Sequence, residues 1–241
     1  MSGHSKWATI KRAKGAADAK RGKIFSTIGK EITIAARAGG GDPNANARLR
    51  TVLLKAREAN MPNDNVERAI KKGTGELAGA AIEQMTYEGY GPAGAGVIVE
   101  VTTDNKNRAA SEVRSVFTRY AGNLAQSGAV SFQFNHCGQF LVGKDKTTED
   151  KLMELALDAG ADDVRTSDEG FEVLCPVNAY YALAGVLEKA GIKPDSSEIV
   201  YLPKVPLVLS EADAAKVQTL LDALEDLDDV QHVFSSHEVA G

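Results

Sequence analysis

Lysine and arginine side chains dominate the first part of the chain, and their characteristic chemistry with a polymer is the neutralisation of phosphates. Residues 1–72 hold 16 basic and 6 acidic side chains, whereas residues 73–241 hold 12 basic and 27 acidic ones. The overall formal charge of −5 conceals this division. The asymmetry indicates a module that faces a polyanion, joined to an acidic body.

The candidate phosphate contacts concentrate in the first 23 residues, a basic arm with little apolar surface that we expect to be mobile when alone. The chain's only Trp lies in this arm and could stack on an unpaired base. Further cations flank the apolar stripe of the second predicted helix on both sides, where they could equally be solvated edges of an amphipathic helix. The predicted nucleic-acid contacts are Lys6, Trp7, Lys11, Arg12, Lys14, Lys20, Arg21, Lys23, Arg48, Arg50, Lys71 and Lys72.

Other site chemistries receive little support from the residue spacing. Gly89–Gly94 has the letters of a dinucleotide-binding loop, but a β-branched run follows it instead of a helix, so we predict a hairpin turn. The four His residues lack metal-ligand spacing, and the acid run from Asp222 to Asp229 reads as a solvated helix end. Cys137 and Cys175 are expected to be thiols that could approach each other. We predict no catalytic residue, no metal and no cofactor.

Hydrophobic periodicity predicts the elements that position the basic side chains. Apolar residues at helical spacing indicate helices over 23–37, 49–59 and 63–73, the last with Asn63 as its N-cap. Strands are expected over 85–88, 96–103 and 129–135, with a helix over 106–120 between the last two. A helix over 211–224 and a strand over 230–234 follow near the end of the chain.

The segment from residue 139 to residue 202 carries the order strand, helix, strand, strand, helix, strand. This order is the ferredoxin-like arrangement, in which two helices cover one face of a four-stranded antiparallel sheet. We therefore predict an α+β protein: a three-helix domain, then two ferredoxin-like α+β domains, the last inserted into the second. The expected boundaries are 1–78, 79–135 with 204–241, and 136–203.

Several segments together resemble the YebC family over essentially the whole chain. They are Gly3–Trp7, Asp18–Lys23, Gly39–Pro43, Asn60–Pro62, Glu67–Gly75, Tyr87–Pro92 and Thr102–Arg108. One departure is Lys14-Gly15-Ala16-Ala17, where the family more often has Lys-Ala-Ala-Gln. This Gly leaves open how far the first helix extends.

The resemblance implies a three-domain, non-enzymatic regulator of gene expression. The family is described as probable DNA-binding transcriptional regulators, while its mitochondrial relatives are translational activators and other members act on the ribosome. DNA, messenger RNA and ribosomal RNA, with basic ribosomal proteins, all stay open as partners. The composition offers no membrane-spanning segment or secretory signal, so we expect a cytoplasmic protein. An enzyme with an interdomain cleft and a purely protein-binding adaptor are the alternatives.

Overall fold

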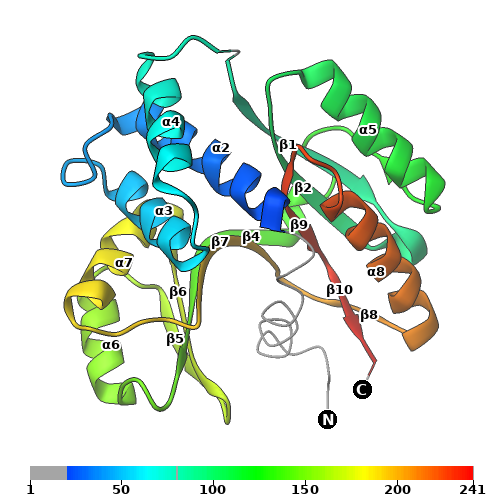
Figure 1. Ribbon diagram of the computed structural model, residues 1–241. Coiled ribbons are helices and arrows are strands. Elements are labelled where there is room, and N and C mark those ends of the chain that lie inside the picture. Colours follow the sequence, from blue (N-terminus) through cyan, green and yellow to red (C-terminus); the bar gives the residue numbers. More distant parts are fainter. Residues whose placement is uncertain (1–20, 80, 241) are drawn as a thin grey trace. The chain divides into compact units, whose positions relative to one another are not determined.

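A computed structural model describes residues 21–79 and 81–240 (Figure 1). Residues 1–20 of the predicted mobile arm lie outside the described residues, whereas its last three residues, 21–23, belong to the first turn of helix α2. The described chain divides into two compact units. Asn135–Leu202 is one unit, and the described residues before and after it form the other. Among the described helices, none is both long enough and apolar enough to cross a membrane.

The larger unit begins with three helices that share one hydrophobic core. They are α2 (Arg21–Gly39), α3 (Ala47–Glu58) and α4 (Asn63–Thr74), as predicted from their apolar spacing (Figure 1). Ile32, Leu49 and Ala69 are buried between them. The expectation for Asn63 is wrong: it is the first residue of α4, and Pro62 occupies the cap position with no side-chain hydrogen bond.

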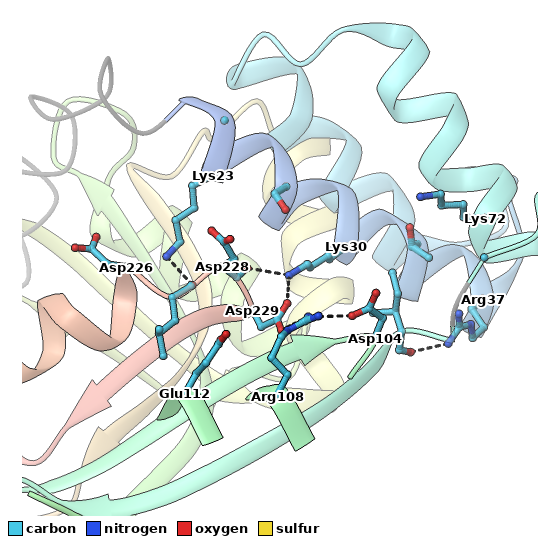
Figure 2. Close-up of a pocket in the computed structure, with 16 residues that line it drawn as sticks. Lys23, Lys30, Arg37, Lys72, Asp104, Arg108, Glu112, Asp226, Asp228 and Asp229 are labelled. Carbon is cyan, nitrogen blue, oxygen red and sulfur yellow. Dashed lines mark hydrogen bonds and ion pairs between the residues drawn. The ribbon is translucent and has the colours of Figure 1, made fainter. Parts of the chain in front are cut away.

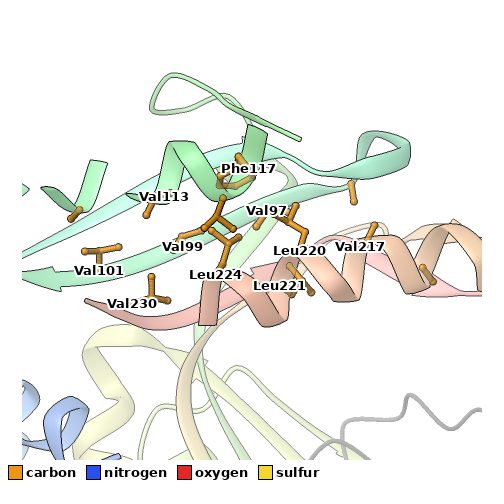
Figure 3. Close-up of a cluster of buried hydrophobic side chains, with 14 of the residues drawn as sticks. Val97, Val99, Val101, Val113, Phe117, Val217, Leu220, Leu221, Leu224 and Val230 are labelled. Atoms are coloured by element: carbon orange, nitrogen blue, oxygen red, sulfur yellow. The ribbon is translucent and has the colours of Figure 1, made fainter. Parts of the chain in front are cut away.

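A mixed α+β part follows in the same unit. Its sheet has the order β3-β1-β2-β9, and two helices pack on one face through residues such as Val99, Phe117 and Leu220 (Figure 3). The predicted hairpin is confirmed, because Pro92–Gly94 forms a short 3₁₀ turn between paired strands β1 and β2. The elements are β1 (Glu83–Tyr90), β2 (Gly96–Thr103), α5 (Lys106–Arg119), β3 (Asn123–Leu124), β8 (Leu207–Leu209), α8 (Glu211–Glu225), β9 (Val230–Ser235) and β10 (His237–Val239).

The smaller unit confirms the ferredoxin-like prediction. Its sheet order is β5-β6-β4-β7, the order that the βαββαβ arrangement requires, with a core beneath its two helices. The elements are β4 (Phe134–Gly143), α6 (Glu149–Asp158), β5 (Asp163–Thr166), β6 (Gly170–Pro176), α7 (Tyr180–Lys189) and β7 (Ser196–Pro203).

The two cysteines of this unit are free thiols. Cys137 lies opposite Pro176 and Cys175 lies opposite Gly138 in the β4–β6 register, so the two side chains point to opposite faces of the sheet. Burial raises the pKa of Cys175 to about 11. Cys175 is therefore a protonated, unreactive core residue at neutral pH.

The strand expected over residues 129–135 is wrong. Ser131–Gln133 is a 3₁₀ turn, and β4 begins only at Phe134. The cause is the carboxylate of Glu88, which accepts backbone N–H bonds from Gly128, Val130 and Ser131 at 2.7–2.8 Å and folds this segment around itself.

Candidate nucleic-acid interface

The last two turns of α4 present a basic face, which we define as Arg68, Lys71 and Lys72. Their spacing of three and four residues places them on one side of the helix, while Ala69 and Gly73 are buried on the other. All three basic side chains are exposed, and none makes an ion pair or side-chain hydrogen bond with another described residue. Their charges are therefore free to neutralise phosphates.

A cavity of about 850 Å³ runs beside α2 (Figure 2). One side of it is formed by successive turns of α2, including Lys23, Lys30 and Arg37. The other side is formed by the loop after α8 and the start of α5, with Lys72 of the basic face at one end. The charged lining residues are Lys23, Lys30, Arg37, Lys72, Asp104, Arg108, Glu112, Asp226, Asp228 and Asp229.

The buried carboxylate of Asp229 lies in the middle of the cavity lining and binds two cations, in an arrangement that we call the Asp229 clamp. Lys30 Nζ lies 2.9 Å from Asp229 Oδ1, and Arg108 Nη2 lies 2.7 Å from Asp229 Oδ2. Thr103 Oγ1 donates to Asp229 Oδ2 at 2.8 Å. Arg108 also pairs with Asp104 at 3.0 Å. The Lys30 and Arg108 charges are thus committed to holding α2 and α5 against the start of β9.

The fold shifts the pKa values of Asp229 and Arg108 further from neutral pH. Burial alone would raise the pKa of Asp229, but hydrogen bonds from Arg108, Lys30 and Thr103 outweigh burial and lower it. The same bond to Asp229, with Asp104, raises the pKa of Arg108. A general acid or base needs a pKa near the working pH, so this constellation suits ion pairing and not proton transfer.

The two ends of the cavity differ in charge. At one end Arg37 donates through Nη1 to the Ile82 carbonyl at 2.6 Å and makes no ion pair with a described residue, and Lys72 lies at this same end (Figure 2). At the other end the lining carries three acidic side chains, Glu112, Asp226 and Asp228, against one cation, Lys23. An anion is accordingly favoured at the Arg37–Lys72 end and repelled at the other.

Comparison with known proteins gives this architecture a family. A family model described as the TACO1/YebC protein N-terminal domain matches residues 5–76, and one described as the TACO1/YebC second and third domain matches residues 82–237. This chain belongs to the TACO1/YebC family. The resemblance read from its sequence motifs is therefore confirmed.

Relatives within the TACO1/YebC family match over nearly the full chain. A "probable transcriptional regulatory protein" of Opitutus terrae is 59% identical over 240 residues, covering 99% of this chain and 97% of the relative. One of the same name from Cupriavidus taiwanensis is 54% identical and covers 98% of both chains. The crystal structure of a conserved hypothetical protein from Aquifex aeolicus has a TM-score of 0.82 at 44% identity, with 93% of each chain covered.

The structure brings together only some of the contacts predicted for this TACO1/YebC chain. Lys71 and Lys72 lie side by side on the basic face. Lys23 lines the cavity and donates to the Leu227 carbonyl at 2.9 Å, and Arg50 donates to the Pro43 carbonyl at 3.4 Å. Arg21 is described only as the first residue of α2, and the remaining predictions lie outside the described residues: Lys6, Trp7, Lys11, Arg12, Lys14 and Lys20.

Arg48 is engaged with acidic side chains on another face of the helical part. It donates to Gln84 Oε1 at 3.5 Å and acts electrostatically on Glu31 and Glu100. Burial raises the pKa of Glu100, whereas the pKa of Glu31 is lowered because His232, Lys55 and Arg48 outweigh its burial. The Arg48 charge therefore already compensates buried carboxylates.

The sequence did not lead us to predict Arg37 and Arg68 as nucleic-acid contacts, and our interpretation of Asp229 as part of a solvated helix end was wrong. Arg37 lies in the last turn of α2, two residues before Gly39-Gly40-Gly41, and this position beside a loop that resembles the family's motif was the available signal. In the acid run, Asp222 is exposed as expected, but Asp229 is buried at 6% exposure and holds the clamp. No group of His, Cys, Asp and Glu within the described residues could hold a metal ion.

Proposed function

We propose that this chain is a regulator of gene expression that binds nucleic acid through phosphate contacts of its helical part. The observation that carries the proposal is a set of four exposed cations that make no ion pair within residues 21–79 and 81–240, namely Arg37 and the basic face of α4. The names of its full-length relatives as transcriptional regulatory proteins support it. The arm from Lys6 to Lys23 would extend the same contact along the polymer.

The proposed contact is to the backbone of the nucleic acid and not to the edges of its bases. Asp64 lies one turn before Arg68 on α4, and Glu67 directly precedes Arg68, so their carboxylates would oppose deep insertion of this helix into a groove. Phosphate contacts orient a protein without reading sequence. The proposed role requires no catalytic residue, metal or cofactor, and its proposed setting is the cytoplasm.

A second candidate is a translation factor that contacts ribosomal or messenger RNA. The acidic end of the cavity, with Glu112, Asp226 and Asp228, favours this candidate because it suits a neighbouring basic protein such as a ribosomal protein. We further propose that residues 1–78, residues 79–135 with 204–241, and residues 136–203 act as three domains, each around its own hydrophobic core.

The test is a binding titration with labelled duplex DNA and with single-stranded RNA of equal length. Changing Arg68, Lys71 and Lys72 together to Glu is expected to lower the affinity for the true partner by at least about 100-fold, because three attractive contacts become repulsive. Single-stranded DNA of the same length is the third probe, because it separates the effect of the sugar from that of strandedness. Tighter binding of DNA than of RNA favours the first candidate, and tighter binding of RNA than of single-stranded DNA favours the second.

A matched variant controls for the change in net charge. Lys144, Lys151 and Lys189 are exposed in the smaller unit, so changing these three to Glu alters the total charge equally. The proposal expects this control to bind within a few-fold of the wild type. Equal losses in both variants would mean that net charge, and not the basic face, drives binding, and the proposal would be wrong.

A further inference from the structure

An aromatic ring projects from the acidic part of the chain into solvent. Phe132 is 65% exposed and lies in the 3₁₀ turn Ser131–Gln133, directly before β4. Two other large hydrophobic residues, Val205 and Val208, are also exposed, at 82% and 63%. The backbones of the two segments meet where Lys204 N–H donates to the Gln133 carbonyl at 2.8 Å.

The turn that carries Phe132 is held firmly from within. Both carboxylate oxygens of Glu88 accept backbone N–H bonds from Gly128, Val130 and Ser131, and Tyr90 donates through its hydroxyl to the Ala129 carbonyl at 2.9 Å. Burial alone would raise the pKa of Glu88, but the hydrogen bonds from these backbone N–H groups outweigh burial and lower it. The carboxylate therefore stays charged at neutral pH.

The residues two positions before and two positions after the exposed ring are core residues. Val130 has 0% exposure and Phe134 has 5%, so the ring is left outside while its neighbours anchor the turn. A ring displayed on a preorganised turn loses little conformational entropy when a ligand covers it. This preorganisation is what a recognition residue needs.

The sequence around Phe132 is free of acidic side chains. Residues 113–144 contain no Asp or Glu, although the chain from residue 73 onward holds 27 of them. The neighbouring stretch 199–210 also contains none, and it includes the exposed Lys204. The charges next to the turn are the buried Glu88 carboxylate, which is already bound by three backbone N–H groups, and the Lys204 ammonium, which is exposed. A polyanion that is repelled elsewhere in the acidic part therefore meets no exposed carboxylate from these two stretches.

The apolar surface here is too small for a stable protein interface. Such an interface buries about 800 Å² on each partner around a hydrophobic centre, whereas this patch consists of one ring and two valines. A single exposed ring, on a turn whose backbone is bonded to that of the exposed Lys204, matches the way in which proteins bind unpaired bases, by stacking near cationic side chains.

We propose that Phe132 stacks on an unpaired base of the nucleic acid that the basic face holds by its phosphates. The inference rests on the proposed function and adds a preference for single-stranded segments, since bases within a duplex are already stacked on one another. It also implies tolerance of base identity, because every base presents an aromatic face.

The experiment measures the affinity of wild type and of Phe132→Ala for a single-stranded 20-nucleotide uridine probe and for a duplex of the same length. The variant is expected to bind the single strand about 5- to 100-fold more weakly, with an unchanged salt dependence and an unchanged affinity for the duplex. Val208→Ala removes an exposed side chain that is not aromatic and is the matched control. Thermal unfolding verifies that both variants fold like the wild type.

A spectroscopic variant reports the stacking directly. Phe132→Trp in a Trp7→Phe background makes residue 132 the only Trp of the chain, and stacking predicts that its fluorescence is quenched by the single-stranded probe and not by the duplex. Glu88→Gln should weaken this quenching by loosening the turn. If Phe132→Ala binds the single strand as tightly as the wild type, the inference is wrong, and contact with a protein partner would then be the role to test for the ring. If the basic-face variant also retains affinity, the proposed function fails as well.

Discussion

Two regions of the larger unit contain the same types of cationic side chain, lysine and arginine, but use them for different purposes. In the Asp229 clamp, Lys30 and Arg108 are drawn to a carboxylate that is almost fully buried. On the basic face of α4, Arg68, Lys71 and Lys72 have no acidic partner among the described residues. The number of cations in each region is similar. What separates a structural cation from a candidate binding cation is whether the fold already supplies its counter-charge.

The largest expected effect comes from removing the carboxylate of the clamp. Asp229→Ala leaves the half-buried Lys30 without its partner, so we expect the free energy of unfolding to fall by about 2–4 kcal/mol in urea titrations. Asp228→Ala changes an exposed neighbour and should be nearly neutral. Equal stability of the two variants would contradict the structural role given to Asp229.

The clamp also predicts a pH dependence. The pKa of Asp229 is lowered in the folded chain, while an unfolded Asp titrates near pH 3.9. The stabilisation is therefore fully present above pH 4 to 5 and is lost as the pH falls through the folded pKa. Asp229→Ala should accordingly show a weaker dependence of stability on pH in this acidic range than the wild type.

A smaller effect is expected from separating α4 from α2 without changing any charge. Gly73 lies where a Cβ atom would collide with the Thr33 carbonyl oxygen and lie 2.7 Å from Ala36 Cβ. Gly73→Ala should therefore cost about 1–3 kcal/mol of unfolding free energy through overpacking. Gly75→Ala is a poor control because Gly75 has a φ of 86°. Gly22→Ala is suitable, since nothing lies within 4 Å of the added carbon.

A matched pair of single substitutions compares the two regions directly. Lys30→Gln should lower stability by about 1–2 kcal/mol and leave nucleic-acid affinity within about twofold. Lys72→Gln should leave the melting temperature unchanged and weaken binding several-fold, with a salt slope that is smaller by about one phosphate contact. The opposite pattern would show that the clamp, and not the basic face, is the binding surface.

The smallest effect is expected at an exposed ion pair outside both regions. Lys106 Nζ lies 2.6 Å from Glu83 Oε2, but both side chains are more than half exposed to solvent. Such pairs contribute about 0–1 kcal/mol, so Lys106→Ala should change stability by less than 1 kcal/mol in the same urea titration. A larger loss would mean that this surface is more strongly coupled than its exposure indicates.

The helices and the ferredoxin-like unit were predictable because they follow from local periodicity. Apolar spacing located α2, α3 and α4, and the order of elements from β4 to β7 determined the arrangement of the sheet. The strand order of the sheet in the larger unit follows less directly from the sequence. Its order β3-β1-β2-β9 matches that of the smaller unit strand for strand, with β1 in the place of β6, although β1 comes first in the chain.

Apart from the cap of α4, which was misplaced by one residue, the failures involve partners distant in the sequence. Asp229 was read as a solvated helix end, because its partner Lys30 lies 199 residues away and no local pattern reports the pairing. The expected strand over 129–135 was lost to Glu88, which lies about 40 residues earlier. The parallel pairing of β8 with β10 likewise joins segments that are individually too short to show a period.

The salt dependence of binding tests the central claim most directly. For duplex DNA, the logarithm of affinity falls with the logarithm of salt concentration by about 0.9 for each phosphate contact. Neutralising Arg68, Lys71 and Lys72 to Gln should make this slope shallower by about 2 to 3 and weaken binding at low salt. A variant with the wild-type slope and affinity would contradict the assignment of the basic face as the phosphate-binding surface.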